Sequence, residues 1–404
     1  NSSFQDSVVT KYNIFNSLFL SLPYRGIFQT GSLLPLLTQQ SEVGFQEGKS
    51  PKQIIENFFE ELLETATEKE RADLLFAFIQ YIERQVVLFD SVEDAAFDQT
   101  HDLVGKGSVN YLTDRLDSDA LKKKLLTKLE DFSVRVVLTA HPTQFYSGKV
   151  LGIINDLEGA IRINDFTEVN QLLLQLGKTA FINHEKPTPF DEAVSLCWFM
   201  ENVYYNAIPA ILTKLIEGLG MEVHNWAYPN LYRLGFWPGG DRDGNPFVNA
   251  DTTLQVAGRL RETLLRAYYR DIRDLKRRLT FKGVEDKIST VERKLNSTIF
   301  GPFEEGYANS QELMDELLAA REVLTSKHQG LFVELLDGFI LKLNIFGFFF
   351  ASLDVRQDSR KHLKAWEDIL KRLERKIPLL NYSDYETWDE EKQINLIMSL
   401  NIPL

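Results

Sequence analysis

The sequence predicts a mainly α-helical protein that carries three short extended segments. Apolar residues recur at helical spacing along most of the 404 residues. Three stretches, 134–141, 231–240 and 348–356, break this period, and each runs into a cluster of polar residues. Because polar clusters at strand ends often carry function, we expect the three clusters to form one shared site.

The helices are predicted from their apolar stripes and end signals. Ser50 and Gln53 form a capping box with Pro51 at the first helical position, ahead of an apolar stripe. Asp251 is the expected N-cap of the long helix that follows it, and Gly347 can end the helix before the third segment. Further amphipathic helices are expected near 71–89, 120–131, 147–163, 190–219, 251–279, 310–326 and 360–375.

The first extended segment, 134–141, reads V-R-V-V-L-T-A-H and is followed by a proline. Its β-branched run predicts a strand buried on both faces, and Pro142 holds His141 in extended backbone. His141 is therefore expected at the carboxyl end of the strand, where parallel sheets carry their chemistry. Two interpretations stay open: a histidine that transfers a proton, and a structural histidine whose ring bonds a carbonyl.

The second segment ends in a glycine-rich, charged loop, G-G-D-R-D-G-N-P over 239–246. The loop begins with the spacing of a phosphate loop, but the Lys and Ser or Thr that such a loop requires are missing. It also begins like a calcium loop, without the glycine and the bidentate glutamate that would complete one. We therefore expect a tight turn in which Asp241 or Asp243 holds Arg242.

Strand alternation in the third segment places Ser352, Asp354 and Arg356 on one face. An arginine at the end of a strand needs an anion as partner. If Asp354 orients it, Arg356 could bind a carboxylate or a phosphate through two donors. The alternative is an internal salt bridge between Arg356 and one of the acidic residues.

Composition and charge restrict the class of partner. The net charge is -13 with a pI near 5.1, and no basic patch is concentrated in the sequence, so no nucleic-acid partner is expected. No window approaches the roughly 18 to 20 apolar residues of a membrane helix, so no membrane partner is expected. With a single cysteine, Cys197, the chain cannot form an intrachain disulfide, which suits a cytoplasmic protein. Cys197 itself is expected in the core. The histidines show no paired spacing, so the sequence predicts no histidine-based metal site.

Four motifs in this chain resemble those of the phosphoenolpyruvate carboxylase family of bacterial type. They read V-L-T-A-H-P-T-Q (137–144), K-P-T-P-F-D-E-A (186–193), F-W-P-G-G-D-R-D-G-N-P (236–246) and F-G-F-F-F-A-S-L-D-V-R-Q-D-S (346–359). Four motifs in the family's order are far more specific than any one of them. The resemblance extends from about residue 132 onward, while the preceding residues match only in helical character.

The resemblance implies a fold, a reaction and a cofactor. The family is mainly helical around a (β/α)8 barrel, which this chain would contain only in part. It joins bicarbonate to phosphoenolpyruvate, giving oxaloacetate and phosphate in a step of carbon dioxide fixation, with Mg²⁺ or Mn²⁺ required and a homo-tetramer expected. By this resemblance His141 is the general base that acts on carboxyphosphate. Arg356 contacts the substrate phosphate, and Trp237, Arg242 and Asp243 line the same pocket.

The chain also departs from the family pattern. Ser147 and Gly148 stand where the family commonly carries an arginine pair, which puts its activator-anion site in doubt here. The family's S-D-S-x-K-D motif, G-R-G-G loop and metal-holding carboxylates are not found. We therefore expect an amino-terminal half, with a helical region over 1–130 and a strand-bearing region over 131–404. Alone, this chain is expected to bind no metal and to be inactive.

Two other classes of function stay open from the sequence. One is a non-catalytic helical binding or scaffold module that keeps half of a phosphoenolpyruvate-carboxylase-like site. The other is an unrelated acid-base enzyme that uses His141 with Asp241 or Asp243.

Overall fold

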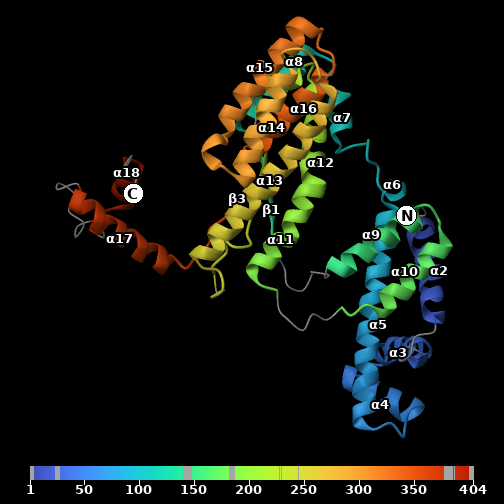
Figure 1. Ribbon diagram of the computed structural model, residues 1–404. Coiled ribbons are helices and arrows are strands. Elements are labelled where there is room, and N and C mark those ends of the chain that lie inside the picture. Colours follow the sequence, from blue (N-terminus) through green and yellow to red (C-terminus); the bar gives the residue numbers. More distant parts are fainter. Residues whose placement is uncertain are drawn as a thin grey trace. The chain divides into compact units, whose positions relative to one another are not determined.

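The computed structural model describes residues 4–22, 28–139, 148–181, 187–226, 228, 230–243, 245–376, 385 and 387–399. The described chain is mainly helical, with one small parallel sheet, as the sequence predicts (Figure 1). Among these residues three strands form the sheet and do not close into a barrel. His141 and the residues around it lie outside the described residues, and so does Lys186.

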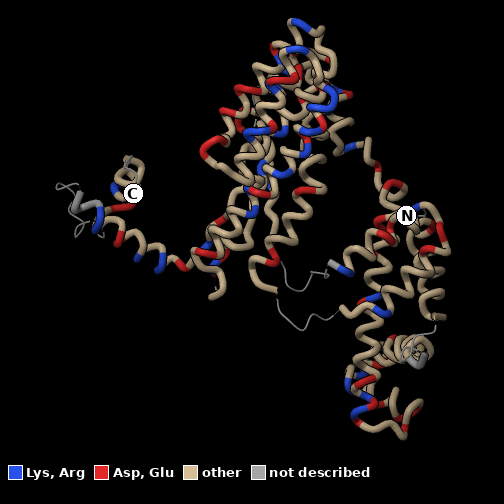
Figure 2. Tube along the Cα trace, in the orientation of Figure 1, with Lys and Arg blue, Asp and Glu red and all other residues tan. Residues whose placement is uncertain are grey.

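The chain divides into two compact units. Unit 1 comprises residues 1–117 and 141–186, and unit 2 comprises residues 118–140 and 187–404. The expected division into a helical region over 1–130 and a strand-bearing region over 131–404 stays a prediction. In each unit both basic and acidic residues are distributed along the helices (Figure 2).

Unit 1 is a helical bundle built on the long helix α5 (Glu68–Ala95). Helices α9, α10, α2 and α3 pack against α5, and the Phe19 ring stacks on the Tyr81 ring in the core between α2 and α5. The other helices of the unit are α2 (Thr10–Ser21), α3 (Phe28–Gln46), α4 (Pro51–Leu62), α6 (Phe97–Thr100), α7 (Val109–Thr113), α9 (Gly148–Arg162) and α10 (Phe166–Lys178). The capping box predicted at the start of α4 is confirmed, because the Ser50 and Gln53 side chains each accept from the other's backbone N–H.

Unit 2 contains the sheet and a second group of helices, of which α13 (Ala250–Arg278) is the longest. Helices α11, α14 and α16 pack against α13, and α15 packs against α14 and α16. Tyr268 of α13 is fully buried, and its hydroxyl donates to the carbonyls of Lys342 and Gly347. The other helices are α8 (Asp119–Asp131), α11 (Pro189–Phe199), α12 (Tyr205–Gly218), α14 (Glu285–Phe300), α15 (Ser310–His328), α16 (Val333–Phe346), α17 (Ser359–Lys376) and α18 (Glu390–Ser399).

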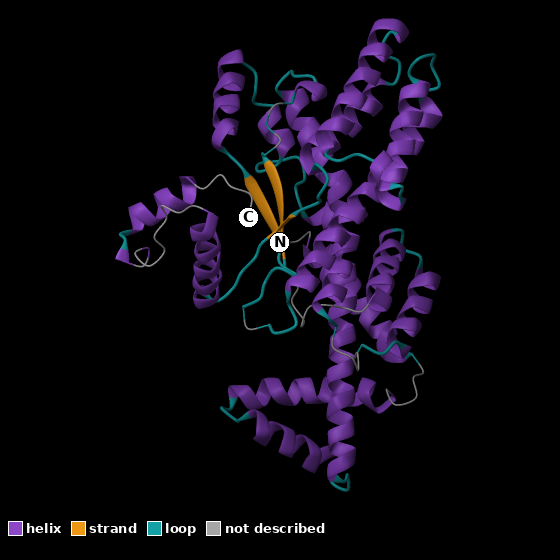
Figure 3. Ribbon diagram, turned by 60° about the vertical axis from the view of Figure 1, so that its left-hand side comes forward, coloured by secondary structure: helices purple, strands orange, loops and turns teal. Residues whose placement is uncertain are grey.

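The sheet has the order β1-β2-β3, and all pairs are parallel. Figure 3 shows the strands among the helices. β1 (Val134–Leu138) pairs along its whole length with β2 (Tyr232–Phe236), whereas β3 (Ser352–Leu353) is a short strand beside the end of β2. The sequence predicted all three strands. The first two end earlier in the structure than predicted, and the third is much shorter than the predicted 348–356. That third prediction was wrong in extent, because the chain turns through Phe348 and Phe350, whose rings are buried, with Phe350 packed against Phe346 of α16.

Two further expectations need correction. β1 is not buried on both faces in this chain: Val137 is 38% exposed, and β1 lies at an edge of the sheet. Asp251 is not the N-cap of α13, because Asn249 accepts from the backbone N–H of Thr252 and Asp251 lies in the first turn. Gly347 ends α16, as predicted, with a positive φ of 56°.

Within the described ranges no helix has both the length and the apolar content needed to cross a membrane.

Candidate functional site

The loop after β2 is held against the chain after β3 by backbone hydrogen bonds. Beyond the strands, Arg356 N–H donates to the Gly240 carbonyl at 3.1 Å, and Arg242 N–H donates to the Arg356 carbonyl at 2.8 Å. A Cβ atom on Gly240 would lie 2.4 Å from the Asp354 carbonyl oxygen, so only glycine allows the two segments to approach this closely. The loop after β2 and the segment after β3 therefore meet at one end of the sheet.

Arg356 is paired with both aspartates of the loop. Its Nε lies 3.2 Å from Asp241 Oδ1, and its Nη2 lies 3.1 Å from Asp243 Oδ2. The guanidinium also lies over the Trp237 ring, 5.3 Å from the ring centroid. The internal salt bridge that the sequence left open as an alternative is therefore formed, while 54% of the Arg356 side chain stays exposed to solvent.

Asp354 does not orient Arg356, contrary to the expectation from strand alternation. Its carboxylate instead pairs with the guanidinium of Arg135, which projects from β1. Gly235 of β2 leaves room for this pair, since a Cβ there would lie 3.0 Å from Arg135 Nε and 3.1 Å from Asp354 Oδ2. The sequence reasoning missed Arg135; the parallel pairing of β1 with β2 and of β2 with β3 is the signal that could have found it.

Arg242 also has a partner other than the one expected. Its Nη2 donates to Thr253 Oγ1 at 2.8 Å, and that hydroxyl donates to the Gly239 carbonyl at 2.6 Å. Neither Asp241 nor Asp243 forms an ion pair with Arg242 in the described structure. Thr253 lies in the first turn of α13, so this contact joins the loop to that helix. The guanidinium Nε of Arg242 is buried and has no hydrogen-bond partner among the described residues.

The K-P-T-P-F-D-E-A motif begins a helix. Thr188 is the N-cap of α11, and its backbone N–H and hydroxyl donate to Asp191 Oδ2 at 2.9 and 2.6 Å. These two hydrogen bonds lower the pKa of the Asp191 carboxyl below its ordinary value. The described part of this motif thus has a local structural role as a capping box.

Acidic, histidine and cysteine side chains elsewhere in the described structure do not form a second candidate site. Across the described ranges, no group of three or more His, Cys, Asp or Glu side chains is arranged to hold a metal ion. The strand-end carboxylates of Asp241, Asp243 and Asp354 are engaged with arginines instead. Cys197 is buried, as the sequence predicts, and burial raises the pKa of its thiol, which suits a core residue better than a nucleophile.

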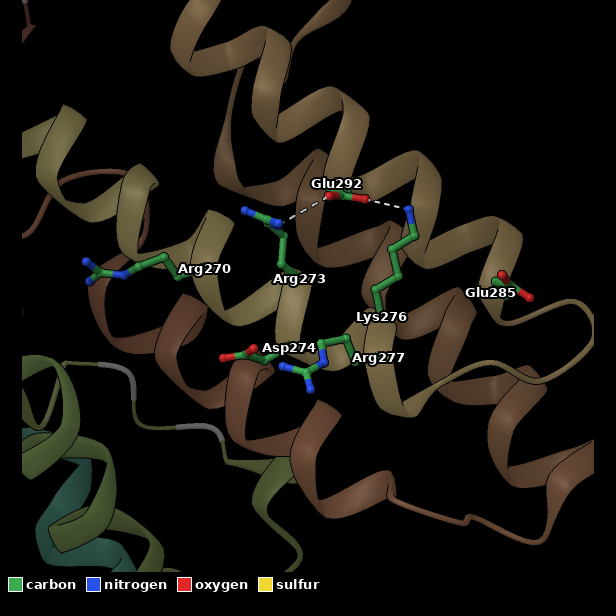
Figure 4. Close-up of a pocket in the computed structure, with 7 residues that line it drawn as sticks. All are labelled: Arg270, Arg273, Asp274, Lys276, Arg277, Glu285 and Glu292. Carbon is green, nitrogen blue, oxygen red and sulfur yellow. Dashed lines mark hydrogen bonds and ion pairs between the residues drawn. The ribbon is translucent and has the colours of Figure 1, made fainter.

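A separate charged hollow lies between α13 and α14, with a volume of about 590 Å³ (Figure 4). Glu292 lies between Lys276 and Arg273, at 2.6 and 3.9 Å, and Arg270 pairs with Glu201 at 2.5 Å. The hollow is also lined by Asp274, Arg277 and Glu285. It lies about 25 Å along α13 from the turn that contacts the β2 loop, and most of its basic charge is neutralised locally. We therefore take the strand ends as the candidate site.

Comparison with known proteins gives a consistent result. The family model described as phosphoenolpyruvate carboxylase matches residues 33–300 and 284–402. A phosphoenolpyruvate carboxylase of Shewanella sediminis is 30% identical over 330 residues, covering 70% of this chain and 37% of the relative. Relatives of the same name from Aeromonas hydrophila and Acinetobacter baylyi are 28% and 27% identical, covering 72% and 68% of this chain and 37% and 35% of their own lengths. This chain thus spans little more than a third of the curated relatives that it matches.

Proposed function

The chain belongs to the phosphoenolpyruvate carboxylase family, and from this membership we propose that it supplies part of the active site of such an enzyme. The reaction would join bicarbonate to phosphoenolpyruvate and release oxaloacetate and inorganic phosphate. The observation that carries the proposal is the meeting of two family motifs at one end of the sheet, where Trp237 and Arg356 are in contact. The resemblance also suggests a tetramer in the cytoplasm and a (β/α)8 barrel that includes these strands.

Arg356 is the proposed contact for the substrate phosphate. A guanidinium offers several N–H donors in a fixed plane, which matches the oxygen atoms of a phosphate. The Trp237 ring restricts where the Arg356 guanidinium can lie. The hydroxyl of Thr253 holds the Arg242 side chain in the neighbouring loop. Trp237, Arg242 and Asp243 would line the pocket around this contact.

His141 is the proposed general base. In the reaction that the resemblance implies, phosphate passes from phosphoenolpyruvate to bicarbonate, giving carboxyphosphate and the enolate of pyruvate. A base that removes the carboxyl proton of carboxyphosphate releases carbon dioxide and phosphate, and the enolate carbon then attacks the carbon dioxide. A neutral imidazole can accept that proton at physiological pH.

The family resemblance implies Mg²⁺ or Mn²⁺, but the described residues do not fit such a site. These cations prefer several carboxylate and carbonyl oxygens, whereas the strand-end carboxylates here are held by arginines. We assign no metal-dependent step to these residues. The proposal is that carboxylates outside this chain hold the metal and that the 404-residue chain alone does not form oxaloacetate.

The direct test is the affinity for phosphoenolpyruvate before and after removal of the Arg356 guanidinium. We expect Arg356→Ala to weaken binding by about tenfold or more, since a charged hydrogen bond to phosphate is lost. Arg360→Ala is the matched control, because Arg360 is highly exposed and, among the described residues, pairs only with its neighbour Asp358. Binding by Arg356→Ala equal to that of the control would return Arg356 to a purely structural salt bridge.

A further inference from the structure

The two aspartates that contact Arg356 are held in very different ways. Asp241 is built into the loop: its N–H donates to the Trp237 carbonyl at 2.9 Å, and its Oδ1 accepts from the backbone N–H of Asp243 at 3.2 Å. Its backbone also pairs with that of Arg356. With 28% of its side chain exposed, Asp241 cannot leave Arg356 Nε without rearranging the turn.

Asp243 has no comparable support for its side chain. The carboxylate is 57% exposed, and within the described structure its side chain contacts only Arg356, through Nη2 at 3.1 Å. An exposed ion pair of this kind contributes little free energy, because water solvates both ions well when they separate. Rotation of the Asp243 side chain would therefore free the Nη2 donors at low cost.

A phosphate bound at Arg356 and the carboxylate of Asp243 cannot share this position. A phosphate monoester carries between about one and two negative charges at neutral pH. A phosphate oxygen bound to Nη2 would bring this negative charge within a few ångströms of the Asp243 carboxylate. Like charges at that distance repel one another, and the repulsion grows as water is excluded from the site. The phosphate must therefore displace Asp243 from Arg356.

We propose that Asp241 and Asp243 have opposite roles in phosphate recognition, an inference that rests on the proposed function of Arg356. Asp241 is a positioning residue that keeps the guanidinium over the Trp237 ring. Asp243 is an exchangeable counterion that occupies Nη2 until a phosphate ester replaces it. The exchange favours ligands that carry more negative charge than a single carboxylate, because they gain more attraction from the guanidinium than the Asp243 carboxylate does.

The test compares phosphoenolpyruvate binding by the longest protein that the native gene encodes and by its Asp243→Asn, Asp241→Asn and Arg356→Ala variants. Fluorescence of Trp237, whose ring lies 5.3 Å from the guanidinium, reports binding, and Trp237→Phe identifies its share of the signal. We expect Asp243→Asn to bind roughly fivefold to tenfold more tightly, because one opposing charge is removed. Asp241→Asn should bind more weakly than wild type, although it removes the same charge.

Asp251→Asn is the charge-matched control: Asp251 is exposed in the first turn of α13, and no ion pair to it is formed among the described residues. Its affinity should equal that of wild type. If Asp243→Asn binds no more tightly than wild type, or Asp241→Asn binds as tightly as Asp243→Asn, while Arg356→Ala loses binding, the division of roles is wrong and the proposed function stands. If Arg356→Ala and Asp243→Asn both respond to phosphoenolpyruvate as wild type does, the proposed function fails as well.

Discussion

Replacement of Gly240 by alanine should loosen the joint between the β2 loop and the segment after β3. The added Cβ would lie 2.4 Å from the Asp354 carbonyl oxygen and 3.0 Å from its carbonyl carbon, so the two backbones must separate. This separation removes two hydrogen bonds, from Arg356 N–H to the Gly240 carbonyl and from Arg242 N–H to the Arg356 carbonyl. At about 0.5 to 1.5 kcal/mol each, the loss lowers the free energy of unfolding by about 1 to 3 kcal/mol.

The matched control is Gly258→Ala, in the interior of α13. A Cβ at Gly258 meets no atom within 4 Å, so the same substitution should raise the free energy of unfolding by about 0.5 to 1 kcal/mol through helix propensity. Urea unfolding followed by tryptophan fluorescence reports unit 2 alone, because the tryptophans, at positions 198, 226, 237, 366 and 388, all belong to that unit. Equal urea midpoints for the two variants would refute the close approach described at Gly240.

Three further predictions concern the packing of each unit. Asp337→Ala should destabilise unit 2 by about 3 to 5 kcal/mol in the same urea assay, because it leaves the Arg321 guanidinium, now bound at 2.6 and 3.1 Å, without its partner. Glu322→Ala, an exposed change next to Arg321 in α15, should stay within about 0.5 kcal/mol of wild type; equal effects would contradict a largely buried pair. Ser50→Ala should destabilise the start of α4 by about 1 kcal/mol, which amide hydrogen exchange in its first turn measures; unchanged exchange there would be inconsistent with the capping box. Cys197 should react with a thiol reagent at pH 8 far more slowly in native protein than in urea. Rapid labelling of the native protein would contradict a buried thiol. Because burial raises the pKa of this thiol, the contribution of the protonated thiol to stability is fully present below the ordinary thiol pKa and is lost as pH rises through the raised value.

Local patterns in the sequence were enough to predict most helices and two of the strands. The capping box at Ser50 and the terminating glycine at Gly347 depend on residues close in sequence, and both are confirmed. The third strand was predicted too long because its aromatic residues fit a strand as well as a core turn. In the structure Phe348 and Phe350 are buried, and only Ser352 and Leu353 pair with β2.

The partners of the site residues could not be predicted from local patterns, because tertiary folding brings them together. Asp354 pairs with Arg135, which is 219 residues away in sequence, and not with its near neighbour Arg356. Arg242 bonds a threonine of α13, which no rule based on charge would select over the two adjacent aspartates. The sequence did predict that the second and third polar clusters meet, and the structure confirms this. The position of His141 stays a prediction.

The most direct measurement of the central claim is oxaloacetate formation by the longest protein that the native gene encodes, with His141→Asn beside wild type. This variant removes the proposed general base and keeps the proposed phosphate contact at Arg356. It should therefore bind phosphoenolpyruvate as wild type does and form almost no oxaloacetate. His362→Asn, an exposed change on α17, should leave both properties intact. Near-normal oxaloacetate formation by His141→Asn, or none by the wild-type protein, would contradict the account.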